Sequence, residues 1–99
     1  MQILKHDQYL DELIAKLNTN NSQIIRNHQL FSTRKRIIAE IDLLQVDKHR
    51  IRVYEVKCSY RLKKAKRQLE KIKKLLENTH DKQIQTFFYH GNAKQLIEL

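Results

Sequence analysis

Two carboxylates and one lysine stand at spacings that can gather them around a single phosphate. Asp42 lies in an apolar segment, and Glu55 and Lys57 flank Val56 in the segment that follows a short turn. Period-two alternation in a strand puts Glu55 and Lys57 on one face and turns Val56 into the opposite layer. If Asp42 lies opposite them on a neighbouring antiparallel strand, two carboxylates and an ammonium group surround a volume suited to hydrated Mg²⁺ and a scissile phosphate. The chemistry that this group indicates is metal-dependent hydrolysis of a phosphodiester.

The elements that must position these residues follow from the hydrophobic periodicity. Apolar residues at helical spacing predict amphipathic helices over residues 5–18 and 61–78. Segments rich in β-branched and aromatic residues predict strands over 23–31, 37–46, 51–58, 83–90 and, at an edge, 94–99. Polar turns are expected at 32–36, 47–50 and 91–92. The chain is expected to form a single domain over residues 1–99, in which the first three strands make a meander.

Composition narrows the class of partner. Lys and Arg number 20 against 11 Asp and Glu in 99 residues, and the net charge of +9 favours a polyanion such as nucleic acid. One cysteine excludes an internal disulfide, and the five histidines show no ligand-like spacing, which argues against a zinc site. Since the chain contains no apolar run of membrane-spanning length and no signal-peptide pattern, we expect a soluble intracellular protein without a membrane partner.

The order helix, three strands, helix, strand, together with two short acidic segments, resembles the restriction-endonuclease-like PD-(D/E)xK superfamily. Residues 39–44 (Ala-Glu-Ile-Asp-Leu-Leu) and 54–57 (Tyr-Glu-Val-Lys) look like the Glu-Ile-Asp-Leu-Ile and Val-Glu-Val-Lys segments of small archaeal Holliday junction resolvases and related compact nucleases. Ile41 replaces the proline that precedes the aspartate in the family pattern. The resemblance implies an α/β (α+β) fold with an αβββαβ core, in which helices flank a mixed central sheet.

The resemblance and the chemistry together assign roles to individual residues. Asp42 and Glu55 are expected to hold Mg²⁺, for which Mn²⁺ can substitute, and the backbone carbonyl of Val56 resembles the third protein ligand of the family. Lys57 is expected to orient or deprotonate the attacking water and to steady the phosphate. Gln68 stands where related nucleases carry a glutamine that reaches back to the site, which implies a supporting catalytic role.

The first helix is expected to add a further group to the site. In the family this helix usually contributes a glutamate to the metal site. Asp7, Asp11 and Glu12 have suitable side chains, but Glu12 points away from the apolar face of the helix, whereas Asp7 and Asp11 flank that face. The sequence leaves the choice among these three acids open.

Basic side chains gather in two predicted segments. The turn at 32–36 is a basic tip that can enter a groove or a junction, and the helix over 61–78 carries lysine and arginine over most of its surface. Ser59, just after the Glu-Val-Lys segment, can donate a hydrogen bond to a phosphate. Solubility alone also explains such charges. The expected nucleic-acid contacts are Arg34, Lys35, Arg36, Ser59, Lys64, Arg67 and Lys71.

The aromatic residues and the histidines are expected to have structural roles. Tyr54 and Tyr60 can stack on bases, but packing is the simpler interpretation. At least one of the adjacent Phe87 and Phe88 should be buried, because successive strand residues point to opposite faces. The histidines are expected at the surface.

The sequence therefore predicts a metal-dependent DNA endonuclease, selective for DNA structure in the manner of a Holliday junction resolvase. A chain of this size with one catalytic centre needs two copies to cut two strands, so a homodimer is expected. The alternatives are a non-catalytic basic DNA-binding protein on the same fold, an ordinary ion-pair ladder between two strands, and an RNA substrate. Lys57 favours the nuclease, because a binding protein has no need for a lysine inside an acidic pair.

Overall fold

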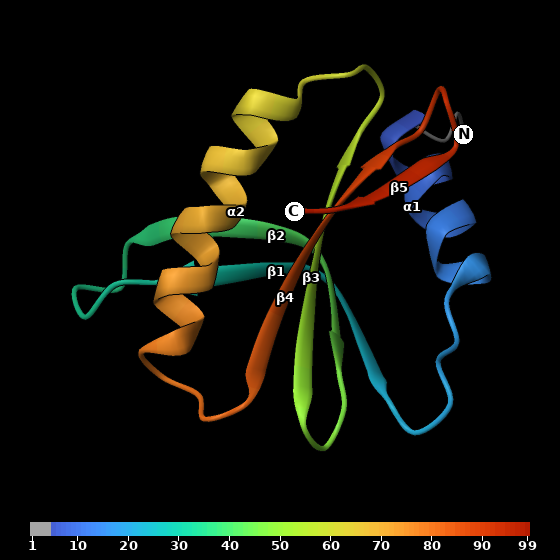
Figure 1. Cartoon of the computed structure of the whole chain (residues 1–99). Coiled ribbons are helices and arrows are strands. Elements are labelled where there is room, and N and C mark those ends of the chain that lie inside the picture. The colour runs from blue at the N-terminus through green and yellow to red at the C-terminus, as the bar shows by residue number, and fades with distance from the viewer. Residues whose placement is uncertain (1–4) are drawn as a thin grey trace.

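The computed structural model describes residues 5–99 and places two helices on opposite faces of one five-stranded sheet (Figure 1). In chain order the elements are α1 (Lys5–Lys16), β1 (Gln23–Phe31), β2 (Ile37–Val46), β3 (Arg50–Lys57), α2 (Leu62–Glu77), β4 (Gln83–His90) and β5 (Gln95–Glu98). This order confirms every predicted helix and strand, with bounds that differ by one or two residues. The fold is of the α+β class.

The sheet is mixed, as predicted. Its strand order is β1-β2-β3-β4-β5, and the β1–β2, β2–β3 and β4–β5 pairs are antiparallel. The β3–β4 pair is parallel and is joined through α2. A parallel pair requires such a crossover, because its strands begin at the same end of the sheet. The C-terminal end of β3 therefore lies near the start of α2 and the turn after β4 (Figure 1).

Alternation along β3 divides the core into two clusters. Val53 packs with Leu69 and other apolar residues of α2 on one face of the sheet. Tyr54 and Val56 pack with Leu10 and other residues of α1 on the opposite face. Val56 thus lies in the layer opposite that of Glu55 and Lys57, as period-two alternation predicts. Of the adjacent phenylalanines, Phe88 is fully buried, which agrees with the sequence expectation.

Tyr9 of α1 packs directly over Gly91 in the turn after β4. A Cβ atom added to Gly91 would overlap three atoms of the Tyr9 ring, whose hydroxyl donates to Oδ1 of Asn92 at 2.5 Å. We expect Gly91→Ala to displace this ring and to lower the free energy of unfolding by roughly 1–3 kcal/mol. Urea unfolding measures the effect, with Ala93→Ser in the same turn as the control. Equal stability of wild type and Gly91→Ala would contradict this packing.

Candidate functional site

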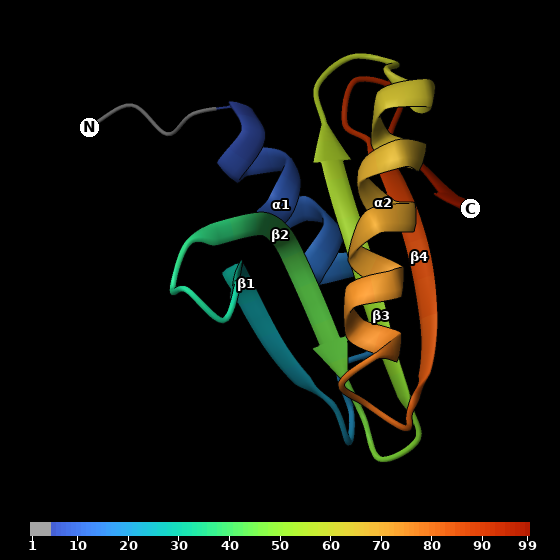
Figure 2. The same cartoon turned by 90° about the vertical axis from the view of Figure 1, so that its left-hand side faces the viewer.

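The β2 and β3 strands separate at the level of Asp42. Their ladder ends where Leu43 lies opposite Tyr54. Beyond that pair, the backbone N–H of Val56 donates to Oδ2 of Asp42 at 2.8 Å. Past this point the hairpin of β1 and β2 bends away from β3 (Figure 2). The Asp42 carboxylate therefore accepts a bond that would otherwise go to a neighbouring backbone carbonyl, and this bond fixes the carboxylate where the two strands separate.

Glu55 and Lys57 lie side by side on the face of β3 that α2 covers. Nζ of Lys57 is 3.0 Å from Oε1 of Glu55, and the Glu55 side chain is 7% exposed. Burial raises the pKa of Glu55, and the charge of Asp42 raises it further, whereas the Lys57 ammonium and His6 lower it. The structure thus brings together the three residues predicted to do chemistry. Because the two carboxylates repel each other in a poorly solvated place, a bound cation would be favourable there.

The backbone of Val56 directs a further oxygen toward this place. In an extended strand the N–H and C=O groups of one residue point to the same side, so the Val56 carbonyl points toward β2, as its N–H does. The next residue, Lys57, points its backbone groups to the opposite side, toward β4, and its carbonyl accepts from the N–H of Gly91 at 2.8 Å. The Val56 carbonyl is therefore on the side that carries Asp42.

These donors fit Mg²⁺. Mg²⁺ is usually held by one or two carboxylates and keeps several waters, whereas zinc prefers three or four nitrogen or sulfur ligands. Asp42, Glu55 and the Val56 carbonyl supply hard oxygen donors of the required kind. In the part of the chain that the structure describes, no three His, Cys, Asp or Glu side chains form a group that could hold a metal. A site with two carboxylates and water is consistent with that finding.

His6 is a site residue that the sequence reasoning missed. Its Nε2 lies 3.4 Å from Oδ2 of Asp42, and its Nδ1 lies 4.0 Å from Oδ1 of Asp7. The His6 side chain is 37% exposed, as expected for a surface histidine, but its contact with Asp42 was not predicted. A signal was present in the sequence, because His6 stands four and seven residues before the buried Leu10 and Leu13. That spacing continues the inward face of α1 into its first turn.

Two of the three acids of α1 that were considered for the site form ion pairs elsewhere. Asp11 forms an ion pair with Arg26 of β1. Glu12 accepts from Nζ of Lys94 at 2.9 Å. Asp7 is half exposed beside His6. The group that α1 presents to Asp42 is thus an imidazole.

Gln68 of α2 faces the strand that carries Asp42. It lines a small cavity of about 140 Å³ together with Glu40 and Lys71. The other residues that line this cavity are Ile38, Ala39 and Ile72. Its Oε1 atom is buried and accepts no hydrogen bond from any residue in the range 5–99. A buried amide oxygen without a donor is unfavourable unless water or a ligand supplies one. None of Asp42, Glu55 and Lys57 lines this cavity, so the supporting role of Gln68 stays a prediction.

The basic tip predicted at 32–36 forms the exposed end of the β1–β2 hairpin (Figure 2). Oγ of Ser32 accepts from the backbone N–H groups of Arg34 and Arg36 at 3.3 Å, and Lys35 adopts a φ of 61°. These bonds fix the turn backbone and leave its three basic side chains exposed. The tip therefore presents positive charge at the end of the hairpin whose β2 strand carries Asp42.

The remaining predicted DNA contacts differ in their surroundings. Lys64 and Arg67 are exposed on α2, and Ser59 lies in the connection from β3 to α2. Lys71, however, donates from Nζ to the carbonyl of Ile38 at 2.6 Å. In this structure Lys71 holds α2 against the start of β2.

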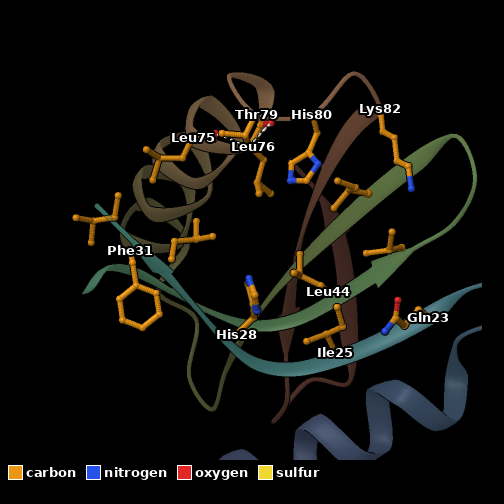
Figure 3. Close-up of a pocket in the computed structure, with 14 residues that line it drawn as sticks. Gln23, Ile25, His28, Phe31, Leu44, Leu75, Leu76, Thr79, His80 and Lys82 are labelled. Atoms are coloured by element: carbon orange, nitrogen blue, oxygen red, sulfur yellow. Dashed lines mark hydrogen bonds between the residues drawn. The ribbon is translucent and has the colours of Figure 1, made fainter. Parts of the chain in front are cut away.

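A separate cavity lies away from the acids. It has a volume of about 400 Å³ and opens between the C-terminal end of α2 and the face of β1 and β2 (Figure 3). Its wall is mainly apolar and includes Phe31, Leu44 and Leu76, with His28 and His80 directed toward the hollow. Asp42 and Glu55 do not line it. This cavity is thus distinct from the candidate catalytic group.

Comparisons with known proteins add no further assignment. No family model, curated protein or solved structure matches this chain. Among the described residues, no helix has the length and apolar character needed to cross a membrane.

Proposed function

We propose that this protein is a Mg²⁺-dependent DNA endonuclease of the restriction-endonuclease-like type, selective for branched DNA as a junction resolvase is. The observation that carries the proposal is the buried Glu55, paired with Lys57 and close to the charge of Asp42, where β2 and β3 separate. An ion-pair ladder that served stability alone would not bury one carboxylate beside another, because burial and repulsion both disfavour it. A metal and a phosphate account for this arrangement.

Each residue of the site has a role in phosphodiester hydrolysis. When bound, Mg²⁺ would supply positive charge beside the scissile phosphate and would make a nearby water more acidic. Asp42, Glu55 and the Val56 carbonyl would hold the ion, for which Mn²⁺ can substitute. Lys57 orients the attacking water and neutralises a non-bridging phosphate oxygen. His6 contacts the Asp42 carboxylate from α1 and helps to fix its orientation.

The positive surface supports DNA as the substrate. The net charge is +9, and exposed basic residues occupy both the hairpin tip and α2. Positive charge of this kind supplies sequence-independent affinity for phosphates. Because one centre cuts one strand, cleavage of two arms of a junction requires two copies, and we include a homodimer in the proposal.

The hairpin tip gives a test of DNA binding that does not depend on cleavage. We expect Arg34→Ala to weaken the binding of every DNA structure and to reduce the slope of log K against log salt by about 0.9, the value for one phosphate contact. Lys48→Ala removes an exposed lysine from the turn at 47–50 and serves as the charge-matched control. Fluorescence anisotropy between 50 and 200 mM salt, roughly the range in which such contacts weaken most, measures both slopes. If the slopes of log K against log salt were equal for the two variants, the tip would not contact DNA phosphates.

The proposed activity is tested by incubating the protein with end-labelled four-way junction, flap, duplex and single-stranded DNA in Mg²⁺ or Mn²⁺. Metal-dependent nicking supports the proposal, and the preferred DNA identifies the substrate. Symmetrical nicks on opposite arms would support the dimer. Salt-sensitive binding without cleavage would instead favour the alternative, a basic DNA-binding protein on the same fold. Matching RNA substrates distinguish an RNA-directed enzyme.

A further inference from the structure

Tyr60 is an exposed aromatic residue in the connection between β3 and α2. Its relative exposure is 55%, although the sequence favours a packed role. The ring is edge-on to Phe88, with centroids 6.0 Å apart at 84°, and lies 5.5 Å from the His90 ring. Because Phe88 is fully buried, the ring that Tyr60 packs against is held in place by the core. Contact with these rings positions Tyr60 while much of its surface remains open.

The Tyr60 ring contacts the residue that is paired with the candidate catalytic lysine. Lys57 of β3 is opposite His90 of β4 in the parallel ladder. Side chains paired in this way stand on the same face of the sheet, about 4.8 Å apart along the hydrogen-bonding direction. His90 therefore connects the two residues, because it is paired with Lys57 and its ring contacts Tyr60.

The surroundings of Tyr60 favour a nucleic-acid strand. The ring lines a shallow hollow with Arg61, Leu62, Lys63 and Lys64 at the start of α2. The first turn of α2 contains no acidic residue. An aromatic ring surrounded by positive charge is the arrangement that binds single strands, in which a base stacks on the ring and phosphates contact the cations. A base inside a continuous duplex is stacked on both faces and offers no face to such a ring.

We propose that Tyr60 stacks on an unpaired base next to the phosphate that lies at Lys57. This inference rests on the proposed function and deepens it by naming the substrate class. The preferred DNA has an unpaired nucleotide beside the cleavage position, as in a flap or an opened branch point. Continuous duplex lacks this contact.

The test uses a flap whose unpaired bases next to the branch are replaced, one at a time, by fluorescent 2-aminopurine, with Ca²⁺ in place of Mg²⁺ to prevent cleavage. We expect wild type and Tyr60→Phe to quench the probe at one position. Tyr60→Leu should lose the quenching and bind the flap roughly tenfold more weakly, while its affinity for continuous duplex stays unchanged. Lys63→Ala is the electrostatic control and should weaken both DNAs equally. Thermal unfolding checks that Tyr60→Leu remains folded.

The outcomes separate this inference from the proposed function. Unchanged quenching and flap affinity in Tyr60→Leu would overturn the stacking contact, even if wild type cleaves DNA. Equal losses on flap and duplex would also overturn it, because an unpaired base would then play no part. If wild type quenches the probe and Tyr60→Leu does not, but wild type cleaves no DNA in Mg²⁺ or Mn²⁺, the nuclease proposal fails and the stacking contact stands.

Discussion

Asp42→Asn is expected to reduce Mg²⁺-dependent DNA cleavage at least about a hundredfold while leaving DNA affinity nearly unchanged. Loss of groups that only orient metal ligands already costs about 10–100-fold, and Asp42 is a proposed ligand itself. The asparagine Oδ1 atom can still accept from the N–H of Val56, so the contact between β2 and β3 at this position should persist. Single-turnover cleavage and anisotropy measure the two quantities.

Glu40→Gln provides the matched control for Asp42→Asn. Glu40 lies on the same strand, is exposed and accepts from Gln29 at 3.5 Å. Its substitution removes the same charge from β2 without touching the proposed metal ligands, so wild-type cleavage is expected. If both variants lost cleavage to a similar degree, the cause would be the changed charge of β2 and not the loss of a metal ligand. Full cleavage by Asp42→Asn would remove Asp42 from the catalytic group.

Glu55→Gln is expected to abolish cleavage and, at neutral pH, to stabilise the fold. Burial is the main cause that raises the pKa of Glu55, and Asp42 adds to it, so ionised Glu55 is disfavoured in the folded protein. Glutamine keeps an oxygen that can accept from Lys57 but carries no charge. A gain of about 1 kcal/mol would raise the melting temperature by about 4–8 °C for a domain of this size. Differential scanning calorimetry with parallel cleavage assays measures both effects.

The pH dependence of this gain tests its cause. A carboxyl whose pKa is raised by folding favours the folded state below its ordinary pKa, and this contribution is lost as pH rises through the raised value. The stability difference between Glu55→Gln and wild type should therefore be near zero below the ordinary glutamate pKa and grow toward neutral pH. Glu70→Gln, at an exposed position of α2, should show no such trend. If Glu55→Gln is less stable than wild type at neutral pH, the ion pair with Lys57 outweighs the cost of burial.

Much of the fold was predictable because local patterns and tertiary packing agree. The period-two alternation of β3 separates Val53 and Glu55 from Tyr54 and Val56, and the two sets face different helices. The short turn at 47–50 makes β2 and β3 antiparallel neighbours. These two features are sufficient to predict that Asp42 lies near Glu55.

Other parts of the site depend on contacts that sequence periodicity does not specify. His6 reaches Asp42 because α1 packs against the face of β3 that carries Tyr54 and Val56. Packing between segments far apart in the chain sets that placement. Apolar residues continue through Ile41, so nothing local marks the end of the β2–β3 ladder at Leu43. The support of Tyr60 by Phe88 and the bond of Lys71 to β2 likewise join residues far apart in the chain.

We propose that Asp42 and Glu55 hold a metal ion that the protein needs to cleave DNA. To test this, cleavage of an end-labelled four-way junction by wild-type protein is followed as Mg²⁺ is raised from zero, beside Asp42→Asn purified in the same way. We predict no cleavage in EDTA, a rate that rises and saturates with Mg²⁺ or Mn²⁺, and loss of cleavage in the variant. Tight, salt-sensitive binding of the junction without strand cleavage at any concentration of either metal would contradict the claim.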